Sequence, residues 1–175
     1  MQVTRWIWRV IGWIALTAFQ VLVLTHLNIG QYVHPYVFPM FIMLLPFATP
    51  RWLVLILAFI SGLIVDMFNN TPGMHASAML VLAFLRPAVT RLLTPITGYE
   101  GIQAPSMGRL GFIWFLLYAL LLTSIHHLVY FQLEVLSFSN LGYTLLNTAA
   151  SVLFSVFLMG NFAFIFSGNR QGERT

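Results

Sequence analysis

The chain contains no cysteine and no lysine, and charged residues make up only 7% of its 175 positions. Without cysteine, it has no disulfide, thiolate nucleophile, iron–sulfur cluster or cysteine-ligated zinc site. Without lysine, it has neither a Schiff-base lysine nor a phosphate-loop lysine. Because soluble domains usually carry about 25% charged residues, the eight basic and four acidic side chains cannot cover a water-facing surface. These absences exclude a soluble enzyme.

Apolar residues are abundant instead, at 59% of the chain, and they gather in six segments. The segments cover residues 10–27, 33–48, 52–67, 74–93, 110–131 and 141–166. The last four approach the roughly 20 residues that cross a hydrocarbon core. Residues 33–48 contain three prolines, so this segment is either a broken span or a re-entrant segment. The sequence predicts one all-α integral membrane domain, a bundle of six transmembrane helices, with a short cytoplasmic tail at residues 167–175.

The arginines distinguish the two interpretations of residues 33–48. With six spans, all eight lie on one side of the membrane or toward it. The opposite loops, at residues 28–36, 68–73 and 132–140, carry Glu134 as their single charge. Because cytoplasmic loops are enriched in arginine and lysine, we expect six spans in an inner membrane with both termini cytoplasmic. The net charge of +4 then reports topology, and no nucleic-acid partner is expected.

Four arginines are predicted to mark the cytoplasmic lipid headgroups: Arg51, Arg86, Arg91 and Arg109. Arg86 lies furthest inside a predicted span and precedes Pro87. A long basic side chain near a helix end usually extends to the interface, so we expect Arg86 to reach the headgroups. A salt bridge between Arg86 and Asp66 is disfavoured, because straight helices place the two residues about 10 Å apart in depth.

Asp66 is the one carboxylate inside a predicted span, where a charge is costly. It has two interpretations: it reaches interfacial water or caps the adjacent turn, or it belongs to a packing surface. Ala58, Gly62 and Asp66 are spaced by four, so they form a stripe on which another helix can approach closely. His75 follows across the short turn, and a structural Asp66–His75 pair is a further expectation.

The remaining polar residues of the spans favour packing over chemistry. His126 and His127 point about 100° apart on a helix, which makes them poor joint metal ligands and predicts hydrogen-bonded histidines. Asn147, Ser151 and Ser155 form a polar stripe that should face other helices. No metalloprotease helix, nucleophile elbow or phosphate loop is present, so we expect no catalytic residue, metal or cofactor.

The segment AFISGLIVDMFNNTPGMHASAMLVLAFLRP, residues 58–87, resembles the MreD family of bacterial rod-shape-determining membrane proteins. The resemblance lies in the G-x-x-x-D pattern of Gly62 and Asp66 and in Gly73 at the start of the next helix. The proline-broken stretch LLPFATPRW, which precedes residues 58–87, is also similar. It implies a non-enzymatic inner-membrane scaffold subunit of the cell-elongation complex, which organises peptidoglycan synthesis. The implied partners are an MreC-like bitopic protein, an MreB-like filament, a RodA-like glycosyltransferase, a class B penicillin-binding protein and membrane lipid.

The family fold is similar to the six-helix S component of energy-coupling-factor vitamin transporters. A solute-binding transporter subunit is therefore the main alternative, because one fold hosts several functions. The A-x-x-x-A docking face of such subunits is absent here, since Phe19 follows Ala15 by four residues. An intramembrane lipid-modifying enzyme is a third class, but Asp66 and Arg86 alone offer buried charge for it. We expect a partner's transmembrane helix to dock on the small-residue face of Ala58 and Gly62.

Overall fold

The computed structural model describes residues 2–26, 33–135 and 141–168, and these residues form helices and loops without a strand. The elements are α1 (Gln2–Leu22), the 3₁₀ turn η1 (Leu24–His26), α2 (Met40–Met43), α3 (Arg51–Asn69), α4 (Met74–Leu92), α5 (Met107–Leu110), α6 (Phe112–Val135) and α7 (Leu141–Gly168). The all-α part of the predicted fold class is confirmed. Most of the predicted tail lies outside the described residues, as do Arg170 and Arg174.

Four helical stretches are long and apolar enough to cross a membrane. They are Trp6–His26, Arg51–Asn69, Phe112–Val135 and Thr144–Ile165. Helix α4 is as long as α3, at 19 residues, but it stands outside this set. Two arginines, a histidine and Pro87 lower its hydropathy, and much of it is buried among neighbouring helices.

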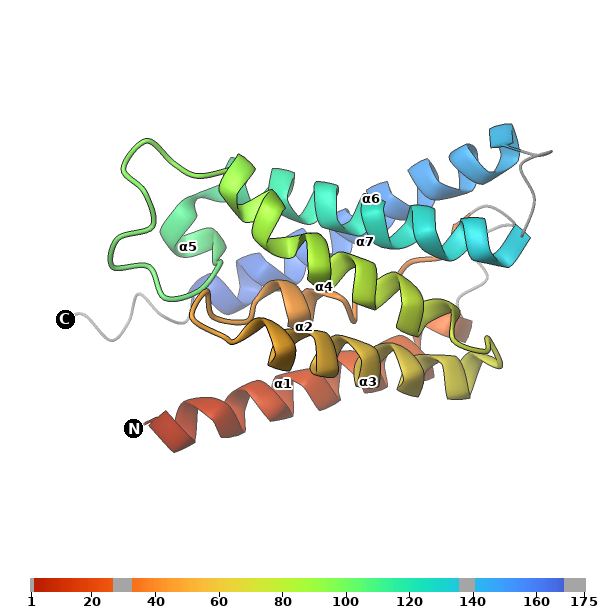
Figure 1. Cartoon of the computed structure of the whole chain (residues 1–175), viewed down its shortest axis with the longest axis horizontal. Coiled ribbons are helices and arrows are strands. Elements are labelled where there is room, and N and C mark those ends of the chain that lie inside the picture. The colour runs from red at the N-terminus through yellow and green to blue at the C-terminus, as the bar shows by residue number, and fades with distance from the viewer. Residues whose placement is uncertain (1, 27–32, 136–140, 169–175) are drawn as a thin grey trace.

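The long helices run side by side, so the bundle has two distinct ends (Figure 1). One end, called the arginine-bearing end, holds the start of α1, the start of α3, the loop of residues 94–106, and α5. The other, called the arginine-free end, holds η1, the α3–α4 turn and the end of α6. Helix α7 runs back from the arginine-free end, so the described chain begins and finishes at the same end.

Residues 33–48 are not a transmembrane helix, and this corrects the prediction of six helical spans. Residues 33–37 are irregular, α2 is a single turn, and turns follow to Pro50. The segment nevertheless runs through the bundle from the arginine-free end to the start of α3 (Figure 1). We call residues 33–48 the irregular segment. Its prolines explain the lost helix, because proline lacks an N–H and restricts the residue before it.

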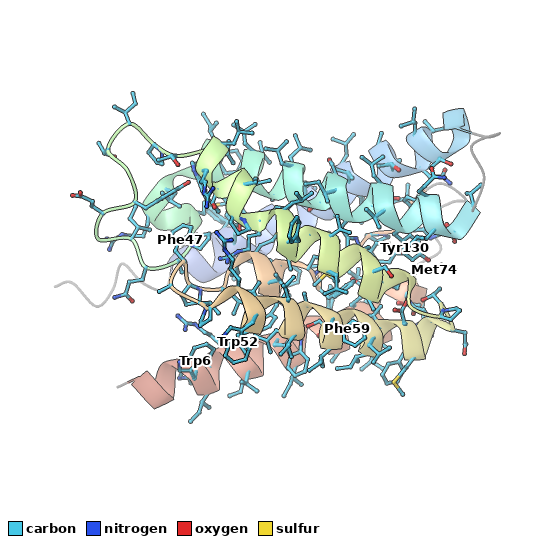
Figure 2. All side chains as sticks on the ribbon, viewed as in Figure 1. Trp6, Phe47, Trp52, Phe59, Met74 and Tyr130 are labelled. Atoms are coloured by element: carbon cyan, nitrogen blue, oxygen red, sulfur yellow. The ribbon has the colours of Figure 1, made fainter. Side chains whose placement is uncertain are left out.

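The irregular segment lies in the centre of the core. Val37 and Ile42 are fully buried, and Phe38 is 1% exposed. Large apolar side chains also cover the outside of the bundle, among them Phe84 and Ile113, each 72% exposed. The labelled Trp6, Trp52 and Phe59 lie along this periphery in Figure 2. An apolar core within an apolar surface is the arrangement expected of a protein whose solvent is lipid.

Candidate functional site

Asp66 caps the N-terminus of α4 from the end of α3. Its Oδ1 accepts hydrogen bonds from the His75 backbone N–H at 2.9 Å and from the Thr71 hydroxyl at 2.7 Å. Its Oδ2 accepts from the Ala76 N–H at 2.9 Å. The first N–H groups of a helix lack intrahelical partners and carry partial positive charge, so a carboxylate is stabilised there. The structure assigns Asp66 to the capping role, at 4% exposure.

The turn between α3 and α4 depends on left-handed backbone at two positions. Gly73 precedes α4 with φ of 77°, which costs glycine little because it has no Cβ. Asn70 ends α3 with φ of 54°, a conformation that asparagine tolerates better than most residues. His75 contributes its backbone N–H to Asp66, while its ring Nε2 lies 3.4 Å from Asn69 Nδ2. The expected side-chain pair of Asp66 and His75 is therefore wrong.

The small-residue face of α3 packs against α4 inside the molecule. A Cβ added at Gly62 would lie 2.5 Å from Ala76 Cα and 2.6 Å from the His75 carbonyl oxygen. Such distances leave no room for a side chain without displacing backbone. Ala58, one helical turn earlier, is fully buried. The expectation that a partner helix docks on Ala58 and Gly62 is wrong, because α4 already occupies this face.

Arg86 is buried in the bundle rather than extended to the headgroups, which corrects the prediction for its side chain. It is 5% exposed. Its Nε donates to the Tyr118 hydroxyl at 3.1 Å, and its Nη2 donates to the Leu45 carbonyl. The Tyr118 hydroxyl in turn donates to the Met43 carbonyl at 3.0 Å. Arg86 and Tyr118 thus supply donors to carbonyls that the single turn of α2 leaves open.

The first half of the irregular segment is held by side chains of α1. Gln20 is fully buried, and its Nε2 donates to the Pro35 carbonyl at 3.0 Å. The Gln20 Oε1 accepts from the Val37 N–H at 2.8 Å. One side-chain amide therefore satisfies a backbone acceptor and a backbone donor two residues apart, in the manner of a neighbouring strand.

The opposite side of the irregular segment is held by the predicted polar stripe of α7. The Ser151 hydroxyl accepts from the His34 N–H at 2.9 Å, and the Ser155 hydroxyl accepts from the Tyr36 N–H at 2.9 Å. His127 of α6 lies with its Nε2 3.3 Å from the His34 carbonyl oxygen. Non-helical backbone is tolerated at membrane depth only where its polar groups find partners within the protein. The stripe faces other parts of the bundle, as the sequence predicts.

Aromatic and histidine rings pack around Tyr36. The ring centroid of Tyr36 lies 4.7 Å from that of His75, 5.1 Å from His127 and 5.7 Å from His126. Tyr130 stacks on His75 at 4.3 Å. The three histidines are fully buried, and neither ring nitrogen of His126 has a hydrogen-bond partner. Over the described residues, no group of three or more histidine, aspartate or glutamate side chains is arranged to hold a metal ion.

A polar pocket of about 300 Å³ opens at the arginine-free end, where its lining residues lie. Its wall includes Tyr36 and Tyr130 from the ring cluster, Asn69 and Thr71 from the α3–α4 turn, and Glu134 near the end of α6. Figure 2 places Tyr130 at this end, near Met74 at the start of α4. The pocket therefore joins three features: the irregular segment, the Asp66 cap and the ring cluster.

A second, apolar groove of about 280 Å³ lies between α1 and α3. Trp13 and Val21 line it from α1, and Ile64 and Phe68 line it from α3. Thr17 also lines the groove, and its hydroxyl has no hydrogen-bond partner. The groove offers packing surface but no arrangement of groups for chemistry.

The arginine-bearing end has exposed arginines and a docked loop. Arg51, Arg91 and Arg109 are exposed there, and Arg109 donates to the Gly101 carbonyl at 3.0 Å. The Phe47 N–H donates to the Gln103 carbonyl at 3.0 Å, which ties the irregular segment to the loop. Burial raises the pKa of Tyr99, so its hydroxyl keeps the proton that it donates to the Thr90 carbonyl at 2.6 Å.

Three residues of these networks were not singled out by sequence reasoning: Gln20, Tyr36 and Tyr118. The signal for Gln20 was present, because an amide inside an apolar span needs partners. Tyr36 and Tyr118 gave no such signal, since tyrosines are common near membrane interfaces. Comparison of the whole chain with known protein families, with curated proteins and with solved structures finds no match.

Proposed function

We propose that this chain is a non-enzymatic scaffold subunit of the bacterial cell-elongation complex, similar in role to the MreD family. It resides in the inner membrane with both termini in the cytoplasm. It binds an MreC-like bitopic protein through transmembrane helices and holds it near an MreB-like filament, a RodA-like glycosyltransferase and a class B penicillin-binding protein. The observation that carries the proposal is the resemblance of residues 58–87 to that family.

The contacts of the resembling residues give the proposal a structural rationale. Gly62 admits α4 against α3, Gly73 turns the chain, and Asp66 caps the new helix. All three build one hairpin, and none lines a catalytic arrangement. A scaffold needs such a fixed element, because it acts by holding its partners in position.

Because Ala58 and Gly62 are buried within the bundle, the partner helix docks on a different surface from the one that the sequence predicts. Both residues already pack inside the chain, so the partner helix meets the exposed apolar sides of the bundle instead. Gly62→Leu is therefore a poor test of docking, since it would disrupt the α3–α4 hairpin before it touched a partner. Assembly has to be tested on the intact chain.

Purification in mild detergent followed by mass spectrometry of the retained proteins tests the proposal. We expect MreC-like and RodA-like proteins at yields well above those retained by an unrelated tagged multi-pass protein. Retention of no cell-wall synthesis protein after in-cell crosslinking would contradict the scaffold role.

A solute-binding transporter subunit is the second candidate, and the polar pocket of about 300 Å³ favours it. The volume is at the lower end of small-molecule sites, which span about 300 to 1,000 Å³. The same purification separates the two functions. A transporter subunit would retain a pair of ATPases and a small molecule rather than cell-wall synthesis proteins.

A further inference from the structure

The pocket at the arginine-free end has a definite hydrogen-bonding character, because the hydroxyl or amide donors of three residues on its wall are already used. The Thr25 hydroxyl donates to the Gln20 carbonyl at 3.0 Å, and the Thr71 hydroxyl donates to Asp66 at 2.7 Å. The Gln20 amide is occupied by the irregular segment. Each of the two threonine oxygens therefore turns lone pairs, not a proton, toward a ligand.

Unused acceptors remain on the same wall. Asn69 Oδ1 is buried and has no hydrogen-bond partner, while Asn69 Nδ2 lies 3.4 Å from His75 Nε2. A buried acceptor without a donor is costly, and a ligand that brings a donor removes that cost. The wall therefore favours a ligand that donates hydrogen bonds over one that accepts them.

The charge around the pocket has one sign apart from the histidine at its rim. Glu134 lies on the wall, and Asp66 accepts a hydrogen bond from the wall residue Thr71. Within the described part of the chain no arginine lines the pocket, and the whole sequence has no lysine. His34 is exposed at the rim, where it interacts electrostatically with Glu134. A cation is attracted to this wall, whereas an anion meets two carboxylates.

Two aromatic rings complete the wall. The Tyr36 and Tyr130 centroids lie 5.2 Å apart with their planes at 65°, in an edge-to-face contact. Both residues are almost fully buried and both line the pocket. Aromatic faces beside a carboxylate are the usual recognition elements for organic ammonium groups.

We propose that this pocket binds the ammonium group of a small organic cation. The group sits against the rings of Tyr36 and Tyr130, faces the carboxylate of Glu134, and satisfies Asn69 Oδ1 when it carries N–H donors. A free amine and the ethanolamine headgroup of a lipid present the same chemistry. The inference does not rest on the scaffold role, because ligand binding is read on the isolated chain and assembly is read in the complex.

Titration of the full chain with choline and with ethanolamine tests this site. The protein is kept in a maltoside detergent and amine-free buffer, and binding is measured calorimetrically. The matched neutral probe is 3,3-dimethyl-1-butanol, which has the shape of choline without its charge. We expect both cations to bind at millimolar or lower concentration and the neutral alcohol to bind at least about tenfold more weakly.

Variants test the wall groups separately. Glu134→Gln keeps the shape of the side chain and should weaken cation binding about threefold to fivefold. Glu100→Gln removes a carboxylate at the opposite end and should leave binding unchanged. Tyr130→Leu should weaken cation binding. Tyr130→Phe retains the ring and should bind the cation as the unmodified chain does. Equal affinity for choline and its neutral analogue, no binding of either cation, or an unchanged Glu134→Gln variant would overturn the proposal.

Nanodiscs distinguish the two sources of the ammonium group. If phosphatidylethanolamine nanodiscs abolish choline binding and phosphatidylglycerol nanodiscs do not, the lipid headgroup occupies the site. If choline binds equally in both, a free amine is the ligand. Either result supports an ammonium site, and loss of binding in both lipids would contradict it.

Discussion

At the scale of single residues, Asp66 shows how hydrogen-bond donors from a neighbouring turn and helix stabilise a buried carboxylate. Two backbone N–H groups and one hydroxyl donate to it. Asp66→Ala leaves these donors buried without a partner, so we expect the free energy of unfolding to fall by about 1 to 2 kcal/mol. Thermal unfolding in detergent measures the loss, with the exposed Glu100→Gln as a control that keeps the melting temperature. An Asp66→Ala protein as stable as the unmodified chain would contradict the capping role.

Gly62 makes a second prediction at this scale. Because a Cβ would lie 2.5 Å from Ala76 Cα, Gly62→Ala should force α3 and α4 apart and cost about 1 to 3 kcal/mol. Gly160→Ala in α7 is the matched control, since nothing lies within 4 Å of its added Cβ. The control should unfold at the same temperature or slightly higher, because alanine favours helix. Equal melting temperatures for the two variants would show that the close approach is unimportant.

Tyr118 links Arg86 to the irregular segment through one hydroxyl. Tyr118→Phe removes that hydroxyl and leaves the Met43 carbonyl without this donor, at an expected cost of about 1 to 3 kcal/mol. Tyr99→Phe provides the comparison, because Tyr99 lies in a partly exposed loop, from which its hydroxyl donates to the Thr90 carbonyl of α4. Chemical denaturation of both variants should show the larger loss at Tyr118, and the reverse order would argue against a structural role for the Arg86 network.

At the scale of elements, the irregular segment depends on side chains from helices distant in sequence. Gln20→Met keeps the length of the side chain but leaves the Pro35 carbonyl and the Val37 N–H without partners. We expect hydrogen exchange to increase across residues 33–39, while the α3–α4 hairpin keeps its protection. Asn161→Met serves as the control, because that exposed amide bonds only within α7. Unchanged exchange in residues 33–39 would show that Gln20 does not hold the irregular segment in place.

The elements also show which parts of the fold were accessible from sequence. Apolar length locates α3, α4, α6 and α7 closely, because a helix satisfies its own backbone and needs only local information. The prolines of the irregular segment warn that it is not a regular span. Its path was not predictable, since its hydrogen-bond partners come from Gln20, His127 and the serines of α7.

The candidate site was predicted only in part for the same physical reason. Spacing brings Ala58, Gly62 and Asp66 to one face of α3, and the structure keeps them there. Spacing does not say what covers that face, and α4 covers it rather than a partner. Arg86 differs from its prediction because open carbonyls at the end of α2 lie within its reach. Tertiary contacts decide both outcomes.

At the scale of the whole molecule, we propose that the irregular segment carries the chain from one side of the membrane to the other. In this proposed topology, five long helices and the irregular segment make six crossings, with the exposed arginines on one side. A re-entrant segment would instead return the chain to its starting side. The two arrangements differ in whether the residues before and after the segment lie on opposite sides of the membrane or on the same side.

Cysteine labelling decides between them, because the chain has no cysteine of its own. His26→Cys and Ala48→Cys place single thiols at exposed positions, one before the irregular segment and one at its last residue. In intact cells, a membrane-impermeant maleimide should label His26→Cys alone, and Ala48→Cys should react only after the membrane is opened. Labelling of both thiols from the same side would contradict the crossing and, with it, the proposed topology.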